Sequence, residues 1–324
     1  MKTKSKALTV ISDYKAVFLL IALIIIGGCS SDKFLSVKNA TNILQQIAPN
    51  GIVAVGLTLV AITGGFDMSV GSVMSLTGVI MMMALKAEMP LPVAIFLGLL
   101  IGIATGFLNG ILVAAVGINP FITTLATQIL VKGIALGITD TYPVKVWNNT
   151  LAQFSLGKLG FMPYAFIVVI VEAAIYQIFL KRTRAGHNIY VCGSNQEAGW
   201  SAGINITKTL VIAYTICGFS ASIGGVFLAS KLGAGSPVAG GDAALLTMTA
   251  FIIGGNSISG SKANMLKTII GVLILGIMNN VMNMMGTMSY LQTMIRGLIV
   301  IIVIAMDAEG VKRYLEKIRG LKKV

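Results

Sequence analysis

The chain has 324 residues, of which 56% are hydrophobic and only 11% are charged, and its mean hydropathy is +0.90. A soluble domain carries roughly a quarter charged residues, so this composition excludes an ordinary soluble protein. The formal net charge of +13 would suit a nucleic-acid partner, but Lys and Arg gather at the ends of apolar stretches, so we expect no nucleic acid. Those stretches are continuously apolar rather than alternating, which excludes a transmembrane barrel.

Ten apolar segments predict an all-α, polytopic membrane protein with about ten transmembrane helices, because a bilayer-spanning helix needs about 20 mostly apolar residues. In chain order the segments are 15–30, 43–63, 70–85, 91–115, 119–139, 163–180, 209–230, 243–258, 266–286 and 290–306. Segment 243–258 is short, and a re-entrant hairpin there is the alternative. That hairpin would leave nine spans and place the basic C-terminal tail outside.

The positions of Lys and Arg predict the orientation of these spans. With ten spans, most of the 24 basic residues lie on the side of the two termini, and the positive-inside rule makes that side cytoplasmic. We therefore expect a cytoplasmic basic N-terminus (residues 1–14), a transmembrane domain (15–306) with an inner loop (181–208), and a cytoplasmic basic C-terminal tail (307–324).

Few polar groups within the expected spans are candidates for chemistry. Asp67 follows Gly64-Gly65 at a break between two apolar segments, so we expect it to cap the next helix and favour its positive end, and that helix begins with Ser69, a natural N-cap. Glu172 lies mid-span, either as a hydrogen-bonded or protonated packing residue or as an ion site. One His and three dispersed Cys predict no metal site, and the Gly255 to Gly260 stretch lacks the Lys that a phosphate loop requires.

Two further patterns suggest how the chain is organised. The inner loop is polar and rich in small residues, and it can form a short helix capped near Ser194 or Asn195. A docking helix for a cytoplasmic protein and a solvated loop suit it equally well. In addition, residues 62–72 echo residues 253–261, and internal repeats are common in transporters.

The stretch Gly64-Gly65-Phe66-Asp67-Met68-Ser69-Val70-Gly71-Ser72 resembles the membrane permeases of bacterial ABC importers for ribose and related simple sugars. Further similar motifs are Asn109-Gly110, Pro120-Phe121-Ile122-Thr123-Thr124-Leu125, Thr183-Arg184-Ala185-Gly186 and Gly254-Gly255-Asn256-Ser257-Ile258. The resemblance covers about residues 35–307.

This resemblance implies a permease in the bacterial cytoplasmic (inner) membrane that imports a sugar-like solute. Its partners would be cytoplasmic ATP-binding subunits, an extracytoplasmic solute-binding protein, and a second permease that is either another copy or a paralogue. ATP hydrolysis would belong to the partner, so this chain would be no enzyme and would need no cofactor. The implied coupling residues are Gly193, Asn195, Glu197, Ala198 and Gly203. The candidate pathway residues are Asp67, Ser69, Asn109, Asn279 and Asn280.

The sequence also departs from the family's pattern. Where the family usually has a Glu followed two residues later by an acidic or polar residue, this chain has Ala244 and Leu246, and the later Gly-Gly is altered at Gly260-Ser261-Lys262. These changes imply a less hydroxylated solute or a partner permease that supplies the acids. Two alternatives remain open: a gradient-driven carrier centred on Glu172, and a structural membrane subunit without its own pathway.

Overall fold

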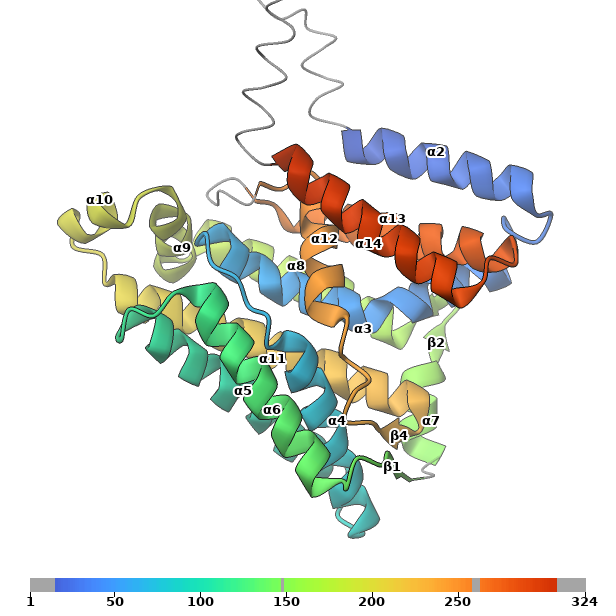
Figure 1. Ribbon diagram of the computed structural model, residues 1–324, viewed down its shortest axis with the longest axis horizontal. Helices are drawn as coiled ribbons and strands as arrows, with labels where there is room; N and C mark the ends of the chain where they lie inside the picture. The colour runs from blue at the N-terminus through green and yellow to red at the C-terminus, as the bar shows by residue number, and fades with distance from the viewer. Residues whose placement is uncertain (1–14, 147–148, 258–262, 308–324) are drawn as a thin grey trace, which may run out of the picture.

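The computed structural model describes residues 15–146, 149–257 and 263–307 of the chain. A helix occupies each of the ten predicted apolar segments (Figure 1). These helices are α2 (Lys15–Ser30), α3 (Val37–Ile62), α4 (Val70–Lys86), α5 (Leu91–Ala114), α6 (Pro120–Ile138), α8 (Tyr164–Arg182), α11 (Ile206–Leu232), α12 (Ala243–Ile253), α13 (Met265–Met284) and α14 (Ser289–Asp307). The N-terminal segment 1–14, nearly all of the C-terminal tail and Gly260-Ser261-Lys262 lie outside the described residues.

Six of these helices are long and apolar enough to cross a membrane by length and composition: α3, α5, α6, α8, α11 and α13. The apolar helices α2, α4 and α12 are shorter, and so is Ser289–Ile302, the part of α14 whose side chains are described. The prediction of an all-α, polytopic membrane protein is confirmed, whereas the number of ten crossings is not established by helix length. Helix α12 has 11 residues and is about 16 Å long, which is roughly half the bilayer core.

The bundle is centred on α3 and α11, whose side chains are mostly buried. Helix α11 packs against α3, α4 and α5. Helices α5 and α11 cross closely at Gly102 and Gly218, where a Cβ on either glycine would collide with the carbonyl oxygen of the other. Small residues allow such close approach of membrane helices. Helix α6 lies on the outside of this group, beside α4 and α5 (Figure 1).

The two ends of the bundle are identified by contacts between loops. At one end, called the β end, strand β1 (Val144–Lys145) pairs antiparallel with β4 (Ala234–Gly235). The hairpin of β2 (Lys158–Leu159) and β3 (Met162–Pro163) follows helix α7 (Asn149–Leu156), and the hydroxyl of Thr41 donates to the carbonyl of Phe161 at 2.9 Å. The start of α3 therefore lies at the β end.

The opposite end, called the α9 end, carries the short helices α9 (Arg184–Ser194) and α10 (Gln196–Ser201), which extend beyond the main bundle (Figure 1). The hydroxyl of Tyr190 on α9 donates to the carbonyl of Ala263 at 3.1 Å. The segment before α13 therefore lies at the α9 end, whereas β4 lies at the β end.

The chain runs from β4 at the β end to the start of α13 at the α9 end, although helix α12 between them is short. Residues 236–242 enter the bundle beside α4, where the N–H of Gly240 donates to the hydroxyl of Ser75 at 2.9 Å. A Cβ on Gly71 would collide with the carbonyl of Gly240, so the two backbones touch. Helix α12 then continues from inside the bundle and packs against α13.

Candidate functional site

The break between α3 and α4 is built from backbone turns and one buried carboxyl group. Helix α3 ends in a Schellman motif in which Gly64 has φ +78°, a conformation that favours glycine. Asp67 is buried, and its Oδ1 accepts the N–H of Ser69 at 2.9 Å and the hydroxyl of Ser69 at 2.6 Å. Ser69 occupies the N-cap position of α4, as expected, but its side chain makes no capping bond.

Asn109 on α5 joins this group. Its Nδ2 donates to the hydroxyl of Ser69 at 2.9 Å, and its own Oδ1 is buried without a hydrogen-bond partner among the residues described. We call Asp67, Ser69 and Asn109 the Asp67 cluster. The cluster brings together three of the five predicted pathway residues. It ties the break to α5 and lines neither of the two cavities described below.

The other two predicted pathway residues are neighbours in sequence but lie in different surroundings. Asn280 is buried and forms a reciprocal amide pair with Asn39: Asn280 Nδ2 donates to Asn39 Oδ1 at 2.8 Å, and Asn39 Nδ2 donates to Asn280 Oδ1 at 3.0 Å. Asn279 instead faces a cavity, and its Oδ1 is buried with no partner in the described part of the chain.

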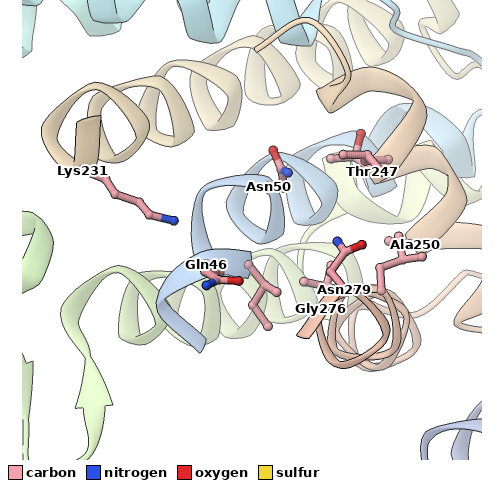
Figure 2. A pocket seen from close by; sticks show the side chains of 11 residues that line it. Gln46, Asn50, Lys231, Thr247, Ala250, Gly276 and Asn279 are labelled. Carbon is pink, nitrogen blue, oxygen red and sulfur yellow. The ribbon is translucent and has the colours of Figure 1, made fainter. Parts of the chain in front are cut away.

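This cavity, the main cavity, has a volume of about 370 Å³ and lies between α3, α12, α13 and the end of α11 (Figure 2). Its polar lining consists of three amides, one hydroxyl and one ammonium group. The lining residues are Gln46, Ile47, Asn50, Lys231, Leu246, Thr247, Ala250, Val272, Leu275, Gly276 and Asn279. Amides and hydroxyls both donate and accept hydrogen bonds, so this wall suits a hydroxylated solute.

A second cavity of about 240 Å³ adjoins the first, since Asn50 and Leu246 line both. Its other lining residues include Val238 and Asp242 from the segment that enters the bundle after β4. The start of α3 and the end of α11 both lie at the β end, so the two cavities lie in that half of the bundle.

The departures at positions 244 and 246 have different consequences. Ala244 is buried in the protein core, whereas Leu246 faces both cavities. The substitution at position 246 therefore gives the cavity an apolar wall.

Glu172 lines neither cavity. It is buried between α8 and α11, where its Oε1 accepts the hydroxyl of Ser220 at 2.5 Å and the hydroxyl of Tyr176 lies 3.0 Å from that of Ser220. Its Oε2 has no partner among the described residues. The bond to Ser220 is what a hydrogen-bonded packing residue would make, whereas the unpartnered Oε2 is what an ion site would use, so both interpretations from the sequence stand.

The predicted coupling residues lie on and around α10. Asn195 caps this helix by accepting the N–H of Ala198 at 2.9 Å, as predicted, and Gly203 with φ +81° ends it. Glu197 and Ala198 are exposed, while Gly193 lies in the last turn of α9. Ile189 and Cys192 anchor α9 in the bundle, and burial raises the pKa of the Cys192 thiol, which keeps it neutral.

Comparison with known proteins identifies the relatives of this chain. The sequence profile of the family described as branched-chain amino acid transport system / permease component matches residues 39–304. The ribose import permease of Escherichia coli (strain K12) is 35% identical over 300 residues, which is 91% of this chain and 93% of that protein. The chain belongs to this family of transport permeases.

Other relatives agree with that assignment. The ribose import permease of Bacillus subtilis is 33% identical over 290 residues (89% of this chain, 90% of the relative), and the fructose import permease of Rhizobium meliloti is 33% identical over 301 residues (90% and 83%). No solved structure matches the chain. The predicted resemblance is confirmed, and the permease is a multi-pass protein of the cytoplasmic membrane.

Sequence reasoning missed most of the cavity wall of this permease. Gln46 and Asn50 are four residues apart and therefore share one face of α3, and polar side chains at that spacing in an apolar helix were an available signal. Lys231 directly follows the predicted span 209–230, where a basic residue is ordinary and gives no signal of a cavity. Thr247 was hidden in an apolar run, and only the packing of α12 against α3 and α13 places it in the cavity.

Proposed function

We propose that this permease forms the membrane pathway of an ATP-driven importer for a sugar-like solute, with ATP hydrolysis in separate subunits. The observation that carries the proposal is the amide-lined main cavity within a chain whose relatives are named as ribose and fructose import permeases. Modest hydrogen bonding from amides and hydroxyls suits a solute that must bind and then leave. The pathway would open alternately to the two sides of the membrane as the ATPase subunits close and open.

In this proposal Asn279 contacts the solute directly. Asp67, Ser69, Asn109 and Asn280 hold the helix breaks and helix contacts that border the pathway, so they act as positioning residues. The buried hydrogen bonds of these four side chains support that division of roles.

The proposed partners occupy opposite ends of the bundle. An extracytoplasmic solute-binding protein delivers the solute at the β end, next to the two cavities. The cytoplasmic ATPase meets the α9 end through Gly193, Asn195, Glu197, Ala198 and Gly203. A second permease, either another copy or a paralogue, completes the pathway. The exposure of α10 and the anchoring of α9 by Ile189 support this route for transmitting motion.

We also propose ten crossings with both termini in the cytoplasm. The contacts β1–β4 and Tyr190–Ala263 support a full passage of the chain between α11 and α13. An even number of crossings would then leave the two termini on the same side, and the positive-inside rule makes that side cytoplasmic.

The test is co-purification of the tagged permease from its native host in mild detergent, with mass spectrometry of the proteins that accompany it. We expect an ATPase subunit, with or without a second permease. Glu197→Lys should reduce both ATPase recovery and ATP-dependent uptake, whereas Asp32→Lys, at an exposed position in the loop between α2 and α3, should leave both unchanged. Recovery of the permease alone, with wild-type uptake by the Glu197→Lys variant, would favour the gradient-driven carrier centred on Glu172.

A further inference from the structure

The main cavity contains one cationic side chain that the sugar pathway does not explain. Lys231 lies in the last turn of α11, and its side chain extends into the cavity toward Gln46 and Asn50 of α3 (Figure 2). Within residues 15–146, 149–257 and 263–307 its ammonium group has no hydrogen-bond or ion-pair partner. The cation is therefore available to a solute.

The rest of the main cavity does not balance this charge. Its other lining residues are neutral. Asp242, an exposed acid just before α12, lines the adjoining second cavity and forms no ion pair with Lys231 in the part of the chain that the structure describes. Lys231 is exposed at the β end of the bundle, so its charge attracts an anionic solute that enters the cavity from that end.

The neutral groups of the wall suit the remainder of such a solute. Gln46 and Asn50 line the cavity from α3, and Asn279 lines it from α13 (Figure 2). The buried Oδ1 of Asn279 lacks a partner among the described residues. These amides suit hydroxyl groups, while Leu246 supplies an apolar surface for carbon-bound hydrogens. The volume of about 370 Å³ is within the range of small-molecule sites.

We propose that Lys231 makes this cavity selective for a sugar that carries a single carboxylate, such as an aldonate. The inference rests on the proposed sugar pathway and specifies its solute class. A lone ammonium group offsets one negative charge, so a carboxylate is favoured over a phosphate dianion, whose second charge would remain unpaired.

The first arm of the test measures the charge of the cavity without any solute. The full-length Cys29→Ser, Leu246→Cys protein in lipid nanodiscs is reacted with an anionic and a cationic methanethiosulfonate, and the ratio of the two rates is compared between variants. The native Cys192 and Cys217 are buried, so the introduced thiol dominates the signal. Lys231→Gln should lower the anion-to-cation ratio about fivefold or more, since Lys231 and Leu246 line the same cavity and removing a unit charge there changes the two rates in opposite directions.

Two variants control this arm. Lys231→Arg should keep the ratio, and Lys208→Gln, which removes an exposed cation at the α9 end, should leave it unchanged. A ratio that does not respond to Lys231→Gln would overturn the proposal. A second outcome would also overturn the proposal. If Asp242→Asn raises the ratio by as much as Lys231→Gln lowers it, and the double variant keeps the original ratio, then Asp242 already neutralises the lysine.

The second arm uses D-ribonate and D-ribose as probes, with sodium chloride to match ionic strength. D-ribonate should protect the Leu246→Cys thiol at concentrations at least tenfold lower than D-ribose, and Lys231→Gln should remove that difference. Equal protection by both sugars would overturn the charge selectivity while leaving the sugar pathway in place. Protection by neither would overturn the inference, whereas the importer itself is judged separately by recovery of its ATPase.

Discussion

At the scale of single residues, the Asp67 carboxyl group accepts hydrogen bonds from two donors of Ser69 inside the protein. Asp67→Ala would leave both donors buried without an acceptor, at a cost of about 1–3 kcal/mol for each group. We expect the apparent melting temperature of the purified permease to fall by several degrees. Asp67→Asn keeps an acceptor oxygen and should lower it less.

The control for this prediction is Asp32→Ala, which removes an exposed carboxyl group outside the bundle. Both substitutions are compared by size-exclusion chromatography after heating in the same detergent. Equal melting temperatures for Asp67→Ala and Asp32→Ala would show that the cluster contributes nothing to stability.

The amide pair of Asn39 and Asn280 provides a second test at this scale. Asn39→Leu leaves the buried Asn280 amide without its partner, and Asn280→Leu leaves Asn39 only its bond to the Phe34 carbonyl, whereas the double replacement removes both amides. We therefore expect the double variant to lose less stability than the two single variants lose together, by about 0.5–2 kcal/mol. The measurement is a double-mutant cycle of thermal stability, and strictly additive effects would contradict the pairing.

At the scale of helices, the crossing of α5 and α11 depends on the absence of side chains. Gly218→Leu would push the two backbones apart, since a Cβ there already collides with the carbonyl of Gly102. We expect little folded permease after extraction. Gly133→Leu on α6 is the matched control, because a Cβ at that glycine meets nothing within 4 Å. Similar yields of monodisperse protein from both variants would contradict a close crossing.

The helix breaks show what a sequence pattern predicts well and where it stops. The break at Gly64-Gly65 was predictable, because only glycine readily takes the positive φ that a Schellman motif requires. Gly255 ends α12 in the same way, which extends the sequence echo to the backbone. Gly286 ends α13 with that motif as well, so the shared geometry alone does not demonstrate an internal repeat.

At the scale of the whole molecule, apolar runs were sufficient to place the long helices, since lipid forces every backbone polar group into internal hydrogen bonds. The cavity was less predictable because its wall combines residues far apart in sequence, such as Gln46, Lys231 and Asn279. Local pattern also assigned Asn279 and Asn280 the same role, although only the packing of α13 against α3 decides which one faces the cavity.

The passage of the chain between α11 and α13 determines the topology of everything that follows. If residues 236–253 cross the membrane together, the loop between α13 and α14 lies at the β end, on the same side as β2. If residues 236–253 instead return to the β side, the loop between α13 and α14 lies on the side of α10. Single cysteines in a Cys29→Ser background at Lys158, Glu197 and Met288, all exposed, distinguish these arrangements.

We expect a membrane-impermeant maleimide to label Lys158→Cys and Met288→Cys in intact spheroplasts, and to label Glu197→Cys only after permeabilisation. The positions at 158 and 197 serve as references for the two sides, because their placement does not depend on α12. Labelling of Met288→Cys only after permeabilisation would mean that α12 does not complete a crossing. The C-terminal tail would then lie outside, and the cavity beside Leu246 would be bordered by a re-entrant helix.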